Sequence, residues 1–350
     1  MSDENKTLTP VWICYVDGKR LDTKHEGALK SIIINDRLNG IGSCVLKFDI
    51  SAEKLLELGT FNLESKISVH LGYKDDVEEV FSGEITGFNG HFMELGHEMC
   101  EIVCCNAIHK LNHGVHCVSF ENKTCSEYIK EIIEKYSLKA DIDDFGSSFE
   151  YDGFNSISDL DYIAECCKKY GKDFYAYDNT VYIKDCIQVR DDDLVFEWGK
   201  SLIEFHSFCN IIDLLSDSNC IGHDANKNED ISGTAKLSDL PIQVGGSKDW
   251  TKISKGGNGL YYNTITDLRF FDSDDAKNSA IGILQDNSYS FMTANGTVEG
   301  TYKLLPGMRV TIKYVGKIFE GEYIADSVCH KFDTIKGYRT SFTLKRNMCS

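Results

Sequence analysis

The chain has 350 residues, and 37 Lys and Arg against 55 Asp and Glu give it a formal net charge of −18. This acidic excess argues against a nucleic-acid-binding protein that works through a basic surface. The apolar content of 42% indicates a globular protein in two or more domains, and no apolar run approaches the roughly 18 residues that a membrane helix needs.

The N-terminal segment 1–6 is polar and lacks the apolar core of a secretory signal, so we expect synthesis in the cytosol. In that reducing compartment the 14 cysteines are expected to be thiols and mostly small core residues. One segment is richer in potential metal ligands, namely Cys104, Cys105, His109, His113, His116 and Cys117. It lacks the paired C-x2-C spacing of zinc sites, so we favour buried thiols over a structural metal there.

The first hundred residues are predicted to form short strands separated by turns. Residues 11–16 run into Asp17-Gly18, a pair typical of two-residue hairpin turns. Further strands are expected at 31–34, 44–50, 66–71 and 80–86. Apolar and polar residues alternate in these segments, so one face of each strand is expected in the core and the other in water.

Between about 113 and 190 the apolar period changes to that of helices. One helix is expected after Thr124, which with Glu127 forms a capping box. A second helix is expected after Ser158, whose capping partner is Asp161, and Gly171 is placed to end it. Both helices carry an apolar stripe, so they are expected to pack on a common core.

A hairpin is predicted at 174–183, which makes the middle of the chain a small α/β module. Strand-like sequence returns at 194–205. The stretch 226–259 is polar and rich in Gly, and we interpret it as an insertion or a lid. A weaker helix is expected at 274–285. Three β-rich segments end the chain, at 309–314, 317–332 and 337–344.

The two β regions share a short self-similarity. I-S-V at 67–69 followed by F-S-G-E at 81–84 matches V-T-I at 310–312 followed by F-E-G-E at 319–322, with a different gap. One interpretation is chance, because strands favour β-branched residues anyway. The other is duplication of a β unit, in which case a trimer would present six similar units around one axis. Such a trimer could join a three-fold partner to a six-fold one.

Segments over most of the chain resemble those of a known family. The most specific is S-D-L-D-Y-I-A at 158–164 with Y-G at 170–171, similar to the family pattern S-D-x-D-F-L…E-Y-G, in which Phe-Leu is commoner than Tyr162-Ile163. V-F-S-G-E-I-T at 80–86 looks like its l-F-x-G-x-I-t strand. The remaining segments are 42–48, 67–72, 123–124, 136–138, 305–310, 319–323 and 330–340. The family is the late control protein D and VgrG group, the hub proteins at the tip of contractile phage tails and related injection machines.

The resemblance implies an α+β, mainly β fold with two similar β-barrel (tail-tube-like) domains and an inserted α/β domain. It divides the chain into a first barrel at 1–112, the α/β domain at 113–196, a discontinuous second barrel at 197–237 and 295–350, and an insertion with a helix at 238–294. It also implies a homotrimer whose paired barrels form a pseudo-hexameric ring, with the α/β domain at the periphery or distal end of the ring.

The partners that the resemblance implies are a hexameric inner-tube protein, a trimeric spike protein and other baseplate proteins. Longer VgrG chains continue into an OB-fold and a β-helical needle, whereas this sequence ends at Ser350, so we expect the spike to be a separate protein. No membrane insertion of its own is expected. The protein would be made in the bacterial cytoplasm and assembled into a phage tail, tailocin or type VI secretion-like baseplate.

We find no motif for catalysis, cofactor binding or metal binding. The sequence has no G-x-S-x-G, H-E-x-x-H, P-loop lysine motif or paired Rossmann glycines. The glycines of 256–259 are interpreted as a loop rather than a phosphate cradle, and the carboxylates of 191–193 as a solvated turn rather than a calcium site. His330 is interpreted as a strand histidine rather than a catalytic base.

We assign several residues of the two predicted barrels to folding and not to a binding site, because Phe fills cores and Gly permits turns or close backbone approach. They are Phe81, Gly83, Pro306, Gly307, Phe319 and Gly321. The acidic excess has a physical use in a conduit, since carboxylates that line a channel would repel DNA or acidic cargo. Such cargo would pass without specific binding.

The sequence therefore predicts a non-enzymatic structural hub that adapts a hexameric tube to a separate trimeric spike. The alternative is a cell-wall (peptidoglycan) hydrolase associated with a phage tail, which would use paired carboxylates, although no pair stands out. A third interpretation, an effector-loading spike, differs from the first in cargo and not in fold.

Overall fold

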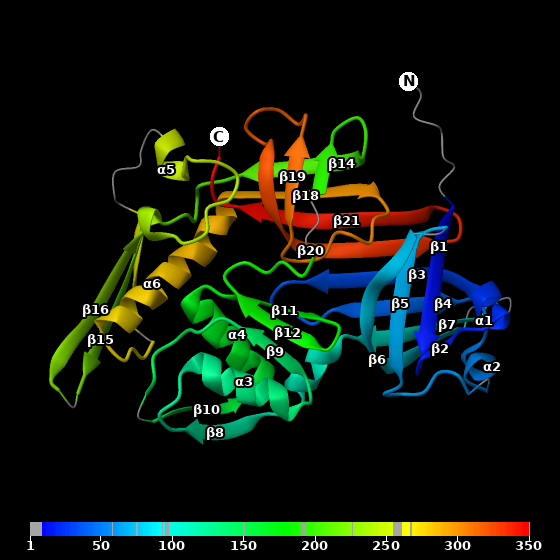
Figure 1. The fold of residues 1–350 in the computed structure, drawn as a ribbon, viewed down its shortest axis with the longest axis horizontal. Helices are drawn as coiled ribbons and strands as arrows, with labels where there is room; N and C mark the ends of the chain where they lie inside the picture. Colours follow the sequence, from blue (N-terminus) through cyan, green and yellow to red (C-terminus); the bar gives the residue numbers. More distant parts are fainter. Residues whose placement is uncertain are drawn as a thin grey trace.

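The computed structural model describes residues 9–349 except 58, 75, 93, 95–97, 150, 191–193, 226, 255–260 and 267. The predicted turn at 191–193 and loop at 256–259 therefore lie outside the described residues. Strands hold 48% of the residues and helices 21%, so the prediction of a mainly β fold is confirmed. One sheet of 13 strands crosses the molecule, and three smaller sheets accompany it (Figure 1).

The first β region supplies six strands that lie in the spatial order β1-β5-β6-β7-β4-β3; we call them the first unit. Their bounds are β1 (Pro10–Val16), β3 (Leu29–Arg37), β4 (Ser43–Phe48), β5 (Lys66–Tyr73), β6 (Asp76–Phe92) and β7 (Glu98–Cys105). The short strand β2 (Lys19–Arg20) pairs with β1 across Asp17-Gly18. Both turn residues have positive φ, as a type I′ turn requires, so the predicted hairpin is confirmed. The short helices α1 (Thr23–Ala28) and α2 (Ala52–Glu57) lie in the connections.

The second β region repeats this arrangement in the order β13-β19-β20-β21-β18-β14, which we call the second unit. Its strands are β13 (Leu194–Glu197), β14 (Leu202–Cys209), β18 (Met292–Glu299), β19 (Arg309–Lys313), β20 (Gly321–Asp333) and β21 (Gly337–Arg346). If the six strands of each unit are numbered by their order along the chain, both units have the same order in space, namely 1-4-5-6-3-2. One orientation differs: β1 is antiparallel to β5, whereas β13 is parallel to β19.

The hairpins β6–β7 and β20–β21 correspond residue by residue. Adding 240 to both members of the pair Glu84–Cys105 gives Ile324–Lys345, and the same holds along both hairpins. Each hairpin carries one bulge, between Ile85 and Gly87 in the first and at the matching place in the second. A bulge adds a residue to one strand, so its position is a specific feature of the pairing. The shared bulge therefore indicates equivalent hairpins.

The sequence similarity between the two β regions is in register in one strand only. Residues 67–69 of β5 and 310–312 of β19 have equivalent partners, as the match I-S-V to V-T-I predicts. The second half of the match is two residues out, because Phe81 is equivalent to Gly321 and not to Phe319. The bulges and the strand order, rather than the shared letters, identify the repeat.

The two units are not separate sheets. Strand β3 of the first unit pairs antiparallel with the last seven residues of β20 of the second, from Ser31–Asp333 to Arg37–Ser327. Among the described strands neither unit closes into a barrel; the edge strand β3 of the first unit instead pairs with the part of β20 that extends beyond β19, which gives one continuous sheet. The sequence predicts two β units, and the structure shows that both belong to one sheet, which was not expected.

The middle of the chain forms the expected α/β module beneath the sheet (Figure 1). It contains η1 (Ala107–Asn112), β8 (His116–Phe120), α3 (Cys125–Lys135), β9 (Lys139–Ile142), β10 (Asp152–Ile157), α4 (Asp159–Tyr170), β11 (Asp173–Tyr177) and β12 (Thr180–Lys184). Both predicted capping boxes are present, Thr124 with Glu127 and Ser158 with Asp161. Gly171 ends α4 with φ 66°, the left-handed conformation expected of a C-terminal glycine.

A further segment lies between β14 and β18 of the second unit. It forms a separate three-stranded sheet of β15 (Asp217–Asp224), β16 (Glu229–Lys236) and β17 (Tyr262–Ile265), together with η2 (Leu237–Asp239), α5 (Trp250–Ile253), α6 (Ser273–Ser288) and η3 (Tyr289–Phe291). The helix predicted at 274–285 is confirmed by α6. The stretch 226–259, which we interpreted as an insertion or a lid without predicting a strand in it, contains β16 at 229–236, where buried and exposed side chains alternate.

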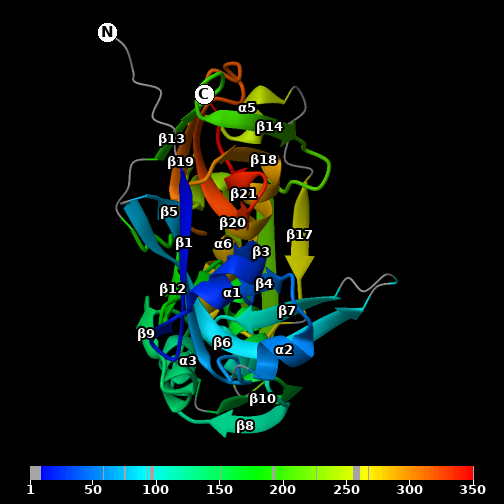
Figure 2. The same ribbon diagram turned by 90° about the vertical axis from the view of Figure 1, so that its right-hand side faces the viewer.

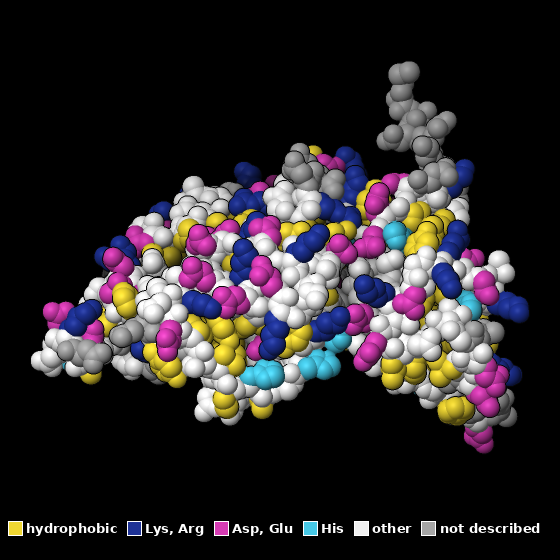
Figure 3. Space-filling view, turned by 60° about the horizontal axis from the view of Figure 1, so that its bottom comes forward, with side chains coloured by type: hydrophobic (Ala, Val, Ile, Leu, Met, Phe, Trp, Pro, Cys, Tyr) yellow, Lys and Arg dark blue, Asp and Glu magenta, His cyan; other side chains and the backbone are white. Residues whose placement is uncertain are grey.

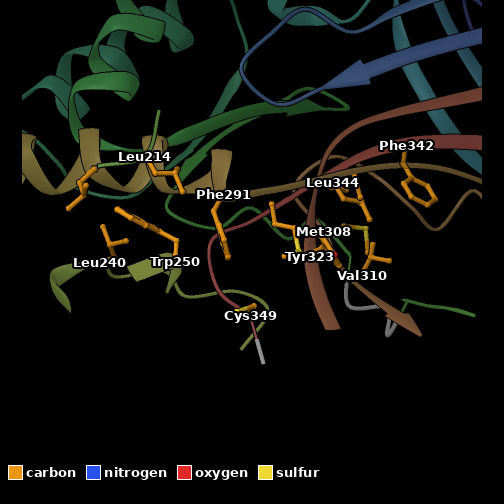
Figure 4. Packing of buried hydrophobic residues seen from close by; sticks show 14 of the residues in the cluster. Leu214, Leu240, Trp250, Phe291, Met308, Val310, Tyr323, Phe342, Leu344 and Cys349 are labelled. Carbon is orange, nitrogen blue, oxygen red and sulfur yellow. Dashed lines mark hydrogen bonds between the residues drawn. The ribbon is translucent and has the colours of Figure 1, made fainter. Parts of the chain in front are cut away.

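The core of the second unit continues into this segment. Figure 4 shows Tyr323 and Leu344 on the strands with Met308 just before β19, Trp250 and Leu240 beside α6, and Phe291 between the two groups. All six side chains are buried in one apolar cluster. Burial of large side chains on both sides of Phe291 holds the separate sheet and α6 against the second unit.

Candidate assembly interface

The joint between β3 and β20 buries an apolar face. Ile32 and Ile34 of β3 are fully buried, and Phe332 of β20, opposite Ile32, is only 6% exposed. The ring of Phe332 lies 6.4 Å from that of Trp12 on β1, so it enters the core of the first unit. Main-chain pairing and apolar burial therefore act together at this joint.

Strand β14 is the counterpart of β3 in the second unit. Both strands start with a bulge, between Leu29 and Ser31 in β3 and between Leu202 and Glu204 in β14. One side of β14 pairs with β18, as β3 pairs with β4. No described strand pairs with the other side, where β3 has β20. An unpaired edge of this kind is a template for another strand.

The end of β6 is the counterpart of the end of β20. Strand β5 pairs with β6 only up to Glu84, and the main chain of Ile85 still bonds to Glu64 and Ser65. The part of β6 from Thr86 to Phe92 has β7 on one side and no described strand on the other. Figure 2 shows this part of β6 projecting with β7 from the body of the molecule. The same part of β20 is the part that holds β3.

The exposure of equivalent side chains differs sharply between the two places. Phe92 is 74% exposed, whereas its equivalent Phe332 is 6% exposed. On β14, Phe208 is 62% exposed and Ile203 is also exposed. Exposed large apolar side chains on the open edges of two strands indicate surfaces that another protein covers. The sequence analysis missed these residues, because a single exposed Phe has no signal in the sequence.

A groove runs along the face of β14 beside the end of α6. Its lining includes Phe208, Asn295, Asp326 and Lys345. Lys345 Nζ lies 3.4 Å from Asp173 and 3.3 Å from Asp326. Burial alone would lower the pKa of Lys345, but these two carboxylates raise it overall, so the amine stays charged. The lysine therefore serves as an ion-pair partner and not as a base.

The candidate catalytic histidine is in the core. His330 is 1% exposed, and its Nδ1 lies 2.9 Å from Tyr338 Oη and 3.3 Å from Thr340 Oγ1. Burial lowers its pKa to about 4. A substrate cannot reach this side chain, and its position on β20 is that of a strand histidine.

The Cys and His residues of segment 100–117 are spread over three elements. Cys104 is buried in β7, His109 lies in η1 with its Nδ1 2.8 Å from Asn106 O, and Cys117 lies in β8 with Sγ 2.6 Å from Asn155 Oδ1. The cysteines of this segment are in no disulfide. Among the described residues no group of three or more His, Cys, Asp or Glu side chains could hold a metal ion.

The contacts or backbone conformations of the residues assigned to folding explain their residue types. A Cβ on Gly83 would lie 2.2 Å from Cys105 O, so the adjacent strand requires glycine there. Gly307 and Gly321 have φ of 87° and 125°, conformations that favour glycine. Phe81 is buried and Phe319 packs on the core of the second unit.

The charged side chains show no single-sign field on the face in Figure 3. Acidic and basic side chains are interspersed there, with apolar side chains between them. No helix within the described part of the chain has the length and apolarity needed to cross a membrane.

Several solved structures share this fold. The 43 kDa tail protein of prophage MuSo2 from Shewanella oneidensis has a TM-score of 0.71 at 12% identity, over 97% of this chain and 99% of that chain. An E. coli component of the type VI secretion system, described as similar to T4 bacteriophage tail proteins gp27 and gp5, gives 0.61 at 10% identity over 95% and 76%. A chain of the Francisella PdpA–VgrG complex gives 0.57 at 10% identity over 99% and 59%.

Residues 8–334 match the family described as Alg8 N-terminal domain. This range includes the first unit, the middle module and the second unit up to the end of β20. No curated protein matches the sequence. At identities of 10–12%, the similarity to the solved structures shows a common fold alone.

Proposed function

The chain belongs to the Alg8 N-terminal domain family. From the fold that it shares with tail proteins, we propose that it is a structural hub of a contractile tail or injection machine. The observation that carries the proposal is the repeat of a six-stranded unit in one chain. The type VI secretion component and the PdpA–VgrG complex among the similar structures support the same class of machine.

The hub is proposed to be a homotrimer. Because each chain holds two equivalent units, three chains place six units around one axis. Such a ring matches a hexameric inner tube on one side and a separate trimeric spike on the other, beside other baseplate proteins. The middle module would lie at the periphery or distal end of the ring, as the resemblance to the late control protein D and VgrG group implies.

The domain division given by the resemblance remains part of this proposal. It assigns 1–112 and 197–237 with 295–350 to two tube-like domains, 113–196 to the α/β domain and 238–294 to the insertion. Within 197–237, β15 and β16 form part of the separate sheet beside the second unit. DNA or effector cargo would pass through the channel without specific binding. The net charge of −18 supports this, because an acidic wall repels acidic cargo.

The hub is proposed to have no catalytic activity. The histidine that the sequence offered as a base, His330, is buried, and Lys345 is held by two carboxylates. No observation favours the alternative of a peptidoglycan hydrolase. Zymography with the purified protein decides between the two, because a cleared band on peptidoglycan would overturn the non-enzymatic proposal.

Light scattering tests the hub. We expect a mass of three times the protomer mass of 39.4 kDa, and a larger complex when the candidate spike or tube protein is added. A protein that stays monomeric and binds neither partner would overturn the proposal.

A further inference from the structure

We propose that β14 of one chain pairs with the free part of β6 of the next chain, in the register that β3 and β20 adopt within the chain. This inference rests on the proposed function, because it names the joint that would close the hub. Its evidence is the exact correspondence of the strands and the different exposure of equivalent residues.

The register follows from the two residue offsets. Adding 173 to a residue number in β3 gives the equivalent residue in β14, since Leu29 and Leu202 both precede the bulge of their strand. Subtracting 240 from a residue number at the end of β20 gives the equivalent residue at the end of β6, as the matching bulges require. The internal pair Asn35–Cys329 then predicts that Phe208 faces Asn89 of the neighbouring chain.

The same conversion places the exposed Phe92 opposite Phe205. The equivalent of Phe92 in the internal joint is Phe332, which faces Ile32 and is buried. Phe205 is half-buried in the isolated chain, whereas Ile32 is fully buried. A neighbouring strand at this edge would cover both Phe92 and Phe205, as β20 and β3 cover each other.

The partner must be a second copy. The two open edges lie seven strand-to-strand steps apart in the large sheet, about 34 Å along it at the usual spacing of strands. Within the described strands of one chain the two edges do not pair, because they belong to opposite parts of this open sheet. A head-to-tail contact between two different edges generates a ring when the rotation closes. In a ring of six units, the β3–β20 joint within each chain would alternate with the β14–β6 joint between chains.

The test is an engineered disulfide in the full chain. Asn89→Cys and Phe208→Cys are both at exposed positions, and directly opposed residues of an antiparallel pair lie within disulfide range. We expect oxidation of the double variant to give a covalent trimer on non-reducing gels. Mixing the two single variants should give covalent dimers and nothing larger, because each chain then offers one new thiol to the joint.

The control is Asn89→Cys with His206→Cys, which lies two residues away on the same face of β14. The proposed register predicts at most a tenth of the yield obtained with Phe208→Cys. Each single variant alone measures the reaction with native thiols. A trimer by light scattering that forms no disulfide between 89 and 208 would overturn the joint and leave the hub intact. Covalent rings that bind neither tube nor spike protein would overturn the hub and keep the joint.

A second variant tests the joint without a thiol. Phe92→Asp should raise the dissociation constant of the assembly at least tenfold, because it places a carboxylate opposite Phe205. Val115→Asp is the matched control, since Val115 is 67% exposed but lies in the middle module. It should leave the mass unchanged. An unchanged mass for Phe92→Asp, or a wild-type chain that remains monomeric, would overturn the proposed joint.

Discussion

Gly171 at the end of α4 lies directly against Gly282 in the middle of α6. A Cβ on Gly171 would lie 2.6 Å from Gly282 Cα, and one on Gly282 would lie 2.3 Å from the carbonyl carbon of Tyr170. Beside this contact Tyr170 Oη donates to Asp275 Oδ1 at 2.8 Å. The absence of two side chains therefore sets the distance between the middle module and α6.

Gly282→Ala should destabilise the protein by about 1–3 kcal/mol, the usual cost of overpacking. The new methyl group would meet backbone atoms of α4, which cannot move aside as a flexible side chain can. The measurement is the midpoint of urea unfolding. Gly27→Ala in α1 is the control, because a Cβ there meets no atom within 4 Å, and it should stabilise by up to about 1 kcal/mol. Equal effects of the two changes would contradict the close contact.

Arg346 holds the connection that precedes β20. Its guanidinium donates to Ile318 O and to Glu320 O, at 2.5 and 2.8 Å, and lies 4.3 Å from the ring centre of Tyr323. Arg346 is fully buried, and Arg346→Met would remove its hydrogen bonds to both carbonyl groups together with its contact with Tyr323. We expect a loss of about 2 kcal/mol or more in the free energy of unfolding.

Arg346→Lys should not restore this loss, because a single ammonium group cannot reproduce the fork of the guanidinium. The matched control is Arg339→Met on the same strand, which is exposed and should change stability by less than about 0.5 kcal/mol. Chemical denaturation of the three variants checks the order. A stable Arg346→Met protein would show that the carbonyl groups find other partners.

His330 should make the protein lose stability in acid. Burial lowers its pKa in the folded state to about 4, against about 6.5 in the unfolded chain, so the unfolded state binds the proton more tightly. Its contribution is fully present above pH 6.5 and is lost as the pH falls towards 4, by about 3 kcal/mol in all. Unfolding free energies of wild type and His330→Gln over this range isolate the effect. Parallel curves for the two proteins would rule it out.

Asp36 should act in the opposite direction. Burial raises its pKa to about 7, although Tyr175 donates to its Oδ2 at 2.7 Å and the Arg37 amide to its Oδ1. The contribution of Asp36 is fully present below pH 3.8 and is lost as the pH rises through 7. Asp36→Asn should therefore gain stability relative to wild type between pH 4 and 8.

Asp333→Asn provides a control of opposite sign. Backbone hydrogen bonds from Ile335 and Lys336 lower the pKa of the partly exposed Asp333 carboxylate, so its contribution is present above pH 3.8 and lost in more acidic solution. Removing this charge should cost stability at neutral pH. Urea titrations at several pH values compare the two variants, and an identical pH dependence for both would contradict the burial of Asp36.

The short-range features could be predicted because each depends on neighbours in the chain. The capping boxes at Thr124 and Ser158 join groups three residues apart, and the Asp17-Gly18 turn needs only two residues with positive φ. The strand β16 was missed because its alternation of small and polar residues resembles that of a loop.

The long-range features were beyond sequence reasoning. The partner of β3 is a strand about 300 residues away, and the bonds between them join main-chain groups that every residue has. The matching letters at 81–84 and 319–322 suggested a pairing that is two residues out, because strand equivalence depends on bulges and partners. The exposed edge at Phe92 could not be predicted either, because it depends on which strands pair with β6.

The sequence by itself determined the kinds of element, their order and the caps that begin and end the helices, since local hydrogen bonds and the period of apolar residues decide these. Only the tertiary structure decided which strands lie side by side, that two six-stranded units share one sheet, and that Phe332 is covered while Phe92 is not. Side-chain patterns select a face for burial, but the choice of a neighbouring strand is made by backbone groups that all residues have in common.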